Sequence, residues 1–333
     1  MTAELSTAPP RAPLTSEPRD AELLSATLVK ARKPGQWVSS VVVLVLAAML
    51  IHTLITNPRF QWDVVGDYFF HDSILRGLGL TLWLTAAVMV CGFALGIVLA
   101  VMRLSSNPIL STLSAGYVWL IRSIPPLVQL LFWYELASLY PQLSLGIPFG
   151  PEFVKADTAH LFSGVLAAFV ALTIDVAAFA AEIVRGGILS VDRGQAEAAE
   201  ALGLSRYRIF RRIILPQAMP AIVPASGNLL IGLLKATSIV SVIAVQDLLY
   251  STQLIYQQNY LILPLLLVAT IWYIIVTSVL SIGQHFAERH YSRGNRSPQH
   301  SLWTTFRENL PLFGRVRTDL LRFDRRTRKA VDT

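Results

Sequence analysis

Long apolar runs separated by short polar stretches dominate the pattern of hydrophobic positions along this chain. An apolar helix of about 20 residues is long enough to cross the hydrocarbon core of a bilayer. The pattern predicts six such spans, roughly at 38–56, 77–102, 115–140, 161–185, 219–245 and 261–286. We therefore expect an all-α integral membrane protein with about six transmembrane helices.

Two of these spans contain residues that shape helix packing. In the second span, Gly92 and Gly96 form a small-xxx-small pair, which permits close approach of another helix. In the third span, Pro125 and Pro126 break the backbone hydrogen-bond ladder. Such a break is tolerated where a helix lines a cavity or packs within protein.

Composition supports a membrane protein. Of the 333 residues, 53% are hydrophobic, and the mean hydropathy of +0.53 is too high for an ordinary soluble protein. The single cysteine, Cys91, lies in an apolar run, so we expect neither an intrachain disulfide nor a cysteine metal cluster. The proline-rich segment before Val38 lacks the apolar stretch of a cleaved signal peptide, and we expect a disordered arm.

The distribution of basic residues predicts the topology. With both termini inside, 23 of the 28 lysines and arginines lie in the termini and the cytoplasmic loops. The remaining five are Arg59, Arg76 and Lys155 in outside loops, and Arg122 and Lys235 within spans. By the positive-inside rule, both termini and the loop between spans four and five are cytoplasmic.

That cytoplasmic loop runs from Gly194 to Pro216 and begins with an alanine-rich segment that favours a helix. Ala198, Ala199 and Leu202 lie on one face of it, where small side chains let another surface approach closely. Gly203 is a natural C-terminal stop for this helix.

A second, amphipathic helix follows in the same loop. Ser205 can cap it, and Pro216 suits the first turn of the next membrane helix. Its apolar stripe consists of Ile209, Phe210, Ile213 and Ile214, and its off-stripe cations are Arg208, Arg211 and Arg212. On physical grounds alone, an ordinary basic helix at the lipid surface would also explain this pattern.

The spacing of the loop residues resembles a known motif. Glu-Ala-Ala, three residues, glycine, nine residues, then Ile-x-Leu-Pro is similar to the EAA loop of importer-type ABC transporter permeases. The resemblance implies that the loop forms a coupling helix, which sits in a cleft of a cytoplasmic ATPase. The ATPase-coupling residues implied are Gly194, Glu197, Ala198, Ala199, Gly203, Ile213, Leu215 and Pro216.

Residues 74–290 further resemble the permeases of polar amino-acid importers. The shared features include Gly-Leu-x-Leu-Thr-Leu at 77–82, an Ala181–Gly203 stretch that contains the EAA motif, and Lys-x-Thr-Ser at 235–238. The resemblance implies a five-helix permease core, to which the first span adds one N-terminal helix. Such permeases often have Asn-Glu and Tyr in span four, where this chain has Asp175-Val176 and Phe179. These differences fall where the translocation path would lie, so the resemblance does not identify the transported solute.

Polar residues within spans are candidates for the translocation path. Asp175 lies about fourteen residues into span four, roughly 20 Å deep, where an ionisable group is costly. A carboxylate at that depth could meet the ammonium group of an amino acid, or it could pair with Lys235 or cap a helix. The candidate substrate-path residues are Arg122, Gln129, Asp175, Asn228, Lys235, Thr237 and Ser238.

Simpler roles exist for several of these residues. Lys235 could extend its charge to the membrane surface, and the hydroxyls could bond their own backbone. Arg122 and Gln129 are seven residues apart and would share a face of one helix. Glu182 and Arg185, at i and i+3, are expected to form a local ion pair rather than to serve transport.

The sequence carries no pattern typical of an enzyme or a metal site. No histidine pair has metal-ligand spacing, no phosphate-binding glycine-lysine-serine loop occurs, and no nucleophile has an attendant base. We expect no cofactor in this chain, with ATP and magnesium bound by a partner ATPase. The basic C-terminal segment suits anionic lipid better than nucleic acid.

Together, these features predict the permease subunit of an ATP-driven ABC importer of the inner membrane, which moves a polar amino acid by alternating access. The expected partners are a cytoplasmic ATPase dimer, a second permease chain (identical or homologous) and an extracytoplasmic amino-acid-binding protein. The alternatives are an ion-gradient-driven transporter, a membrane enzyme, or an ABC permease for another small solute such as an opine or peptide.

The predicted organisation has four parts. Residues 1–36 form a disordered cytoplasmic arm, and 37–73 an additional helix with an external interfacial stretch. Residues 74–290 form the permease domain with its cytoplasmic loop at 186–220, and 291–333 form a basic cytoplasmic tail.

Overall fold

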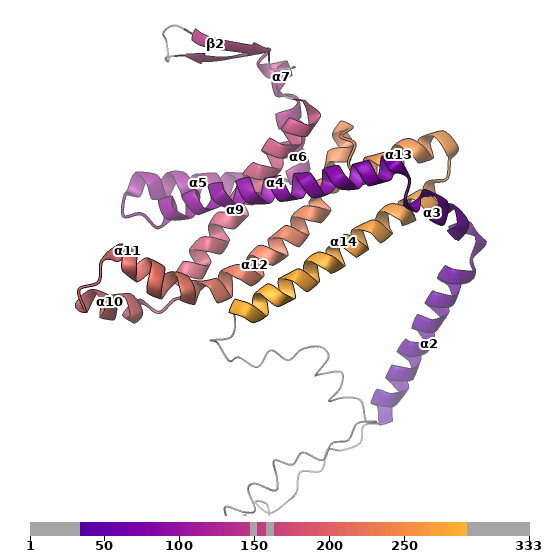
Figure 1. The fold of residues 1–333 in the computed structure, drawn as a ribbon, viewed down its shortest axis with the longest axis horizontal. Coiled ribbons are helices and arrows are strands. Elements are labelled where there is room, and N and C mark those ends of the chain that lie inside the picture. The colour runs from indigo at the N-terminus through magenta and orange to yellow at the C-terminus, as the bar shows by residue number, and fades with distance from the viewer. Residues whose placement is uncertain (1–33, 147–151, 158–162, 292–333) are drawn as a thin grey trace, which may run out of the picture. The chain divides into compact units, whose positions relative to one another are not determined.

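The computed structural model describes residues 34–146, 152–157 and 163–291 (Figure 1). The predicted arm over 1–36 therefore lies mostly outside the described residues, and the predicted tail over 291–333 almost wholly so. The chain divides into two compact units, residues 1–60 and 61–333, which are described separately. The described part of the first unit consists of helix α2 (Pro34–Thr56) and a short 3-10 turn, η1 (Pro58–Phe60).

The second unit is built from long helices that match the predicted spans. The long apolar elements are α4 (Asp72–Arg103), α9 (Gly164–Leu189), a continuous helical stretch over Arg206–Ile243, and α14 (Ile262–Tyr291). Counting α2, five helices in the described part of the chain are long and apolar enough to cross a membrane, and a bent pair brings the number to six. This confirms the predicted all-α membrane fold of about six spans.

The most extensive helix packing joins α4 to α9. A side-chain carbon on Gly96 would lie 2.5 Å from the Ala180 methyl group, and one on Gly92 would lie 2.7 Å from Val176. Real side chains essentially never approach this closely, so both positions require glycine. The predicted small-residue contact between helices is confirmed.

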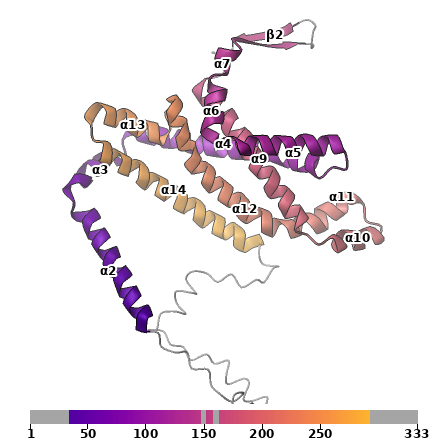
Figure 2. The ribbon, with the colours of Figure 1, turned by 180° about the vertical axis from the view of Figure 1, so that it is seen from behind.

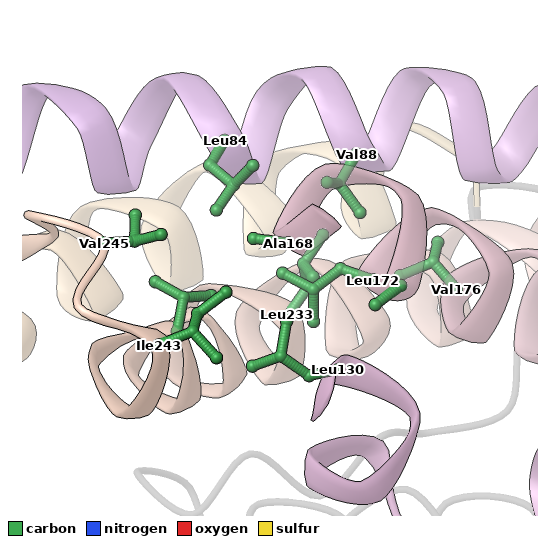
Figure 3. Packing of buried hydrophobic residues seen from close by; sticks show 11 residues of the cluster. Leu84, Val88, Leu130, Ala168, Leu172, Val176, Leu233, Ile243 and Val245 are labelled. Atoms are coloured by element: carbon green, nitrogen blue, oxygen red, sulfur yellow. The ribbon is translucent and has the colours of Figure 1, made fainter. Parts of the chain in front are cut away.

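The core of the unit lies where α4 and α9 meet the segments around Leu130, Leu233 and Ile243 (Figure 3). Leu84 and Val88 of α4 pack against Leu172 of α9, Leu130 and Leu233, and all five are almost fully buried. Burial of a leucine side chain stabilises a structure by about 2 kcal/mol where water is the reference, and in a bilayer close packing supplies the attraction instead.

The third span is broken. Helix α5 (Pro108–Ser123) and helix α6 (Pro126–Tyr134) meet at 99°. Ile124 between them is extended, as expected for a residue before proline, and Pro126 occupies the first turn of α6. The two prolines therefore do more than kink one span; they redirect the chain.

The helix after the cytoplasmic loop is continuous with the fifth span. Helix α11 (Arg206–Ile209) passes through a π turn, η2 (Phe210–Ile214), into α12 (Leu215–Ala236) and a 3-10 segment, η3 (Thr237–Ile243). Pro216 lies in the first turn of α12 as expected, but the loop helix is not separate from it, since both belong to one continuous helical stretch. In the π turn the Leu215 N–H donates to the Phe210 carbonyl, five residues back, which lets the helix run into a proline that has no N–H.

Short elements complete the unit, and the sequence pattern did not predict them. After α6 come α7 (Leu136–Leu139) and an antiparallel hairpin of β1 (Gln142–Gly146) and β2 (Glu152–Asp157), beyond α6 in both views (Figures 1 and 2). Helix α3 (Trp62–Phe69) packs on α14, where the Phe69 and Trp272 rings stack at 4.7 Å. Helix α13 (Leu248–Asn259) lies between the fifth and sixth spans.

Candidate coupling loop and translocation residues

The predicted first loop helix is present as α10 (Arg193–Ala201). The Asp192 side chain accepts a hydrogen bond of 2.7 Å from the Gly194 N–H and caps the helix start. At the other end, Gly203 has a φ of 75°, and Leu204 N–H donates to the Ala199 carbonyl at 3.2 Å. This six-to-one bond around a left-handed glycine is a Schellman motif, which confirms Gly203 as the stop.

The faces of α10 differ from the sequence expectation. Ala199 is buried against the protein, whereas Glu197, Ala198 and Leu202 are exposed. The expectation that Ala199 shares an approachable face with Ala198 and Leu202 is therefore wrong. In a helix, successive residues are 100° apart, so the methyl group of Ala199 fills the contact with the chain's own helices.

The rest of the loop combines buried and exposed residues. Ile209 is buried, Ile213 and Leu215 are half-buried, and Pro216 is exposed. Ser205 stands at the N-cap of α11 but its side chain makes no capping bond. The cations of the second helix, Arg208, Arg211 and Arg212, are exposed as expected.

The bend between α5 and α6 separates two candidate path residues. Arg122 lies at the end of α5, with its guanidinium carbon 5.1 Å from the centre of the Phe179 ring. It lines a cleft of about 380 Å³ together with Arg103 and Glu182. Arg122 and Gln129 do not share a helix face, because the helix between them is broken. The local pair of Glu182 and Arg185 is confirmed at 2.8 Å.

Gln129 has a structural position. Its side chain is buried, and its amide nitrogen donates to the carbonyls of Ile121 and Ile124 at 2.9 Å each. These carbonyls lie at the C-terminal end of α5, where the break removes their i+4 partners; the Ile121 carbonyl also accepts from the Ile124 N–H at 3.3 Å. Gln129 therefore closes the hydrogen-bond ladder that the two prolines open.

Asp175 is half-buried in α9, near the Gln129 amide and the Tyr117 phenol. The Tyr117 hydroxyl itself donates to the Ile174 carbonyl at 2.9 Å. Among the described residues, Asp175 forms no ion pair, so the pairing with Lys235 that the sequence left open is absent. The structure thus brings together Asp175, Gln129 and Tyr117 from three helices.

Lys235, Thr237 and Ser238 lie where α12 passes into η3. Thr237 is fully buried and donates to the Leu234 carbonyl at 2.7 Å, whereas Ser238 donates to the Lys235 carbonyl at 2.8 Å. Both hydroxyls therefore bond their own backbone, the simpler of their two predicted roles. Lys235 and Ser238 also line a groove beside α14.

Asn228 faces α14. Its side-chain oxygen accepts a hydrogen bond of 3.2 Å from Gln284, whose amide also donates to the Pro224 carbonyl and to Glu288. The Gln284 side chain lies directly over Gly227, so a larger residue at 227 would displace it. Asn228 thus helps to hold α12 against α14.

Asp247 is a buried polar residue that the sequence analysis did not single out. It caps α13, with one carboxylate oxygen accepting from the Tyr250 N–H at 2.8 Å. Burial raises the pKa of this carboxyl to about 6. Beside it, the Leu248 N–H donates to the buried hydroxyl of Thr81 at 3.0 Å. An aspartate directly before an apolar segment was the available signal.

No group of three or more histidine, cysteine, aspartate or glutamate side chains suited to a metal ion occurs in the part of the chain that the structure describes.

Residues 92–293 match the model of the family described as the inner membrane component of binding-protein-dependent transport systems. The chain is 40% identical over 266 residues to the arginine transport system permease protein ArgU of Corynebacterium glutamicum, covering 79% of this chain and 82% of ArgU. It is 33% identical to YxeN, a probable amino-acid permease protein of Bacillus subtilis, covering 71% of this chain and 98% of YxeN.

A solved structure described as an amino acid ABC transporter with histidines has the same fold. Its chain superposes with a TM-score of 0.56 at 34% identity, covering 66% of this chain and 94% of that chain. These similarities favour the ABC importer over the ion-gradient-driven alternative. The chain belongs to the family of inner membrane components of binding-protein-dependent transport systems, as a multi-pass, non-catalytic permease subunit of an ABC importer.

Proposed function

We propose that this permease carries a cationic amino acid of the arginine type, and that Asp175 binds the positively charged side chain during passage. The observation that carries the proposal is a half-buried carboxylate in α9 with no cationic partner among the described residues. The printed name of the 40% identical relative, an arginine permease, supports the same substrate class.

The surroundings of Asp175 suit this role. Its neighbours Gln129 and Tyr117 are neutral, so they do not cancel the charge of the carboxylate. A guanidinium group presents parallel N–H donors to a carboxylate, which makes this pair strong and geometrically specific. A substrate cation that arrives would supply the countercharge that the protein does not.

Arg122 would act in the opposite sense. Its guanidinium group lies over the ring of Phe179, and Phe179 is one helical turn beyond Asp175 on α9. A fixed cation there disfavours a second positive charge and attracts a carboxylate. The two residues together fit a zwitterion with a cationic side chain better than a neutral sugar.

Uptake by the reconstituted transporter tests the proposal. The permease, its ATPase and its binding protein are assembled in proteoliposomes, and uptake of labelled L-arginine is compared with that of L-glutamine. Asp175→Asn should lower arginine uptake by roughly ten-fold or more, because a charge-assisted bond contributes about 1.5–3 kcal/mol. Asp175→Glu should retain part of it.

Asp72→Asn is the matched control, since Asp72 is an exposed carboxylate at the start of α4. It should leave uptake unchanged. Normal arginine uptake by an assembled Asp175→Asn transporter would remove Asp175 from the path. Uptake of neutral amino acids only, in the unaltered transporter, would instead refute the cationic substrate class.

We further propose the assembly in which this permease works. The ATPase docks on the cytoplasmic loop through the residues of the coupling motif, and buried Ala199 supports this surface from behind. The motif residues are Gly194, Glu197, Ala198, Ala199, Gly203, Ile213, Leu215 and Pro216. Two permease chains, two ATPases that bind ATP and magnesium, and one external binding protein make up the transporter. Both termini and the loop lie in the cytoplasm, with the domain boundaries at 36, 73 and 290.

The exposure of the loop supports this role. Leu202 is 80% exposed and Tyr207 is 68% exposed, although both are large apolar or aromatic side chains on a polar loop. An exposed apolar surface of this kind marks a protein contact. When ATP closes the ATPase dimer, movement of α10 would pass through α11 and the π turn directly into α12.

A further inference from the structure

A groove of about 470 Å³ lies between α14 and the junction of α12 with η3. Its volume falls within the range of roughly 300–1,000 Å³ that is typical of small-molecule sites. Six of the seven residues that line it carry a polar group, although most of the groove surface is apolar and it lies along membrane-spanning helices: Lys235, Ser238, Thr270, Tyr273, Ile274, Thr277 and Ser278. Polar groups at this place are costly against lipid, so those that reach the groove are candidates for contact with water, solute or protein.

Lys235 is the only charged residue among those that line the groove. It is exposed within the apolar stretch Arg206–Ile243, and none of the ion pairs found among the described residues includes it. An ammonium group in a membrane span requires an anionic or strongly polar partner. The partner can therefore come from a bound molecule.

The hydroxyl groups of the groove are oriented by their own backbone. Ser238 donates its proton to the Lys235 carbonyl at 2.8 Å, and Thr270 donates to the Leu266 carbonyl at 2.7 Å. A hydroxyl has a single proton, so these two oxygens can only accept hydrogen bonds from a ligand. Acceptors of this kind suit an ammonium group.

Tyr273 lines the groove without offering it a hydroxyl. Its phenol oxygen is buried near Thr237 and Asp247, away from a ligand in the groove. The groove thus offers one cation and two fixed neutral acceptors. An amino-acid headgroup presents a carboxylate that suits the cation and an ammonium group that suits the acceptors.

We propose that this groove is a subsite for the zwitterionic headgroup of an amino acid, in which Lys235 binds the α-carboxylate and the oxygens of Ser238 and Thr270 accept from the α-ammonium group. This inference rests on the proposed amino-acid permease function, but not on the cationic class of side chain. It adds α14 to the residues that contact solute, since the sequence analysis assigned none of Thr270, Tyr273, Thr277 and Ser278 to the path.

Direct binding to the permease–ATPase complex tests the subsite without the selectivity of a binding protein. Labelled L-arginine is bound to the complex in lipid nanodiscs, and agmatine, which lacks the carboxylate, is the competitor. Lys235→Met should weaken arginine binding by roughly ten- to a hundred-fold. Agmatine binding should not change, so the preference for arginine over agmatine should collapse.

Three further variants sharpen the result. Lys235→Arg keeps the charge and should keep the preference for arginine over agmatine. Thr270→Val is nearly isosteric, and by removing an ammonium acceptor it should weaken both ligands by about two- to ten-fold. Arg76→Met removes an exposed cation at the outer part of α4 and should alter neither affinity.

Two outcomes would overturn the subsite. Lys235→Met could keep the arginine preference, or it could weaken arginine and agmatine equally, which would indicate a structural effect. A failure of the proposed cationic substrate class can be told apart from a failure of the subsite. If the complex binds another amino acid instead of arginine, the effect of Lys235→Met is measured on the preference for that amino acid over its decarboxylated amine. Binding of no amino acid at all would refute both proposals.

Discussion

At the scale of single residues, Asp247 shows how burial and capping oppose each other. One oxygen of its fully buried carboxylate caps α13, whereas the other has no hydrogen-bond partner of normal geometry. Burial without a cation disfavours the charged form and raises the pKa of this carboxyl from 3.8 to about 6. The ionised carboxylate of Asp247 therefore lowers the stability of the folded protein at neutral pH.

Replacement of Asp247 with asparagine should raise the free energy of unfolding by an amount that depends on pH. The native state binds this proton more tightly than the unfolded state does, so the wild-type protein loses stability as pH rises from about 4 through 6. Asparagine caps helices as well as aspartate but carries no charge. Asp247→Asn should therefore be more stable than wild type at pH 8, by up to about 3 kcal/mol.

Thermal unfolding of the purified protein in detergent, from pH 5 to 8, measures this difference. The gain should shrink as the pH falls, since the wild-type carboxyl becomes protonated. An equal effect at every pH would show that the substitution acts through packing and not through the charge of Asp247.

At the scale of elements, the broken third span shows what sequence reasoning reaches. The prolines at 125 and 126 predicted a break, and the structure has it. The 99° change of direction depends on Gln129, because its amide satisfies the carbonyls that the break exposes. That partnership joins positions five and eight residues apart across a bend, and no helical or strand periodicity reports it.

Removal of the Gln129 amide should destabilise the break. Gln129→Leu keeps the approximate size but leaves the Ile124 carbonyl unpaired in an apolar setting and the Ile121 carbonyl with only the 3.3 Å bond from the Ile124 N–H. We expect a loss of about 1–3 kcal/mol in the free energy of unfolding, measured by thermal unfolding in detergent. Gln217→Leu is the control, because exposed Gln217 makes a single bond to the Ile213 carbonyl. Equal losses in the two variants would contradict the role of Gln129.

The hydrophobic pattern found the long elements and missed the short ones. Transmembrane spans are readily predicted from the sequence, because about twenty apolar residues are needed to cross a bilayer. Helix α13 has only twelve residues and the two strands have five and six, so composition gives a weak signal for each. The Glu-Ala-Ala–Gly spacing located α10 and its end at Gly203, but it could not show that Ala199 faces inward, since that depends on what packs behind the helix.

At the scale of the molecule, the second unit has two chemically different ends (Figures 1 and 2). One end carries α10 and α11 with their exposed arginines, and the other carries α3 and α13 with their aromatic and amide side chains. Arginine-rich loops remain on the cytoplasmic side of a membrane, whereas aromatic residues collect at interfaces. The arrangement fits cytoplasmic placement of the coupling loop.

Cysteine labelling tests this placement and the docking of the ATPase together. Cys91 is the single cysteine, so Cys91→Ala gives a background without thiols. Into it are introduced Glu197→Cys on α10 and, separately, Gln258→Cys on α13, both at exposed positions. A membrane-impermeant maleimide added to intact cells with a permeable outer envelope should label position 258 and spare position 197.

In inside-out vesicles the pattern should reverse, because the reagent then meets the cytoplasmic face. Assembly with the ATPase should further protect position 197, since the coupling surface is covered, but should leave position 258 unchanged. Labelling of position 197 from outside would invert the topology and remove the loop from the ATPase. Labelling only from inside, without protection, would keep the topology and refute docking through the Glu197 face of α10.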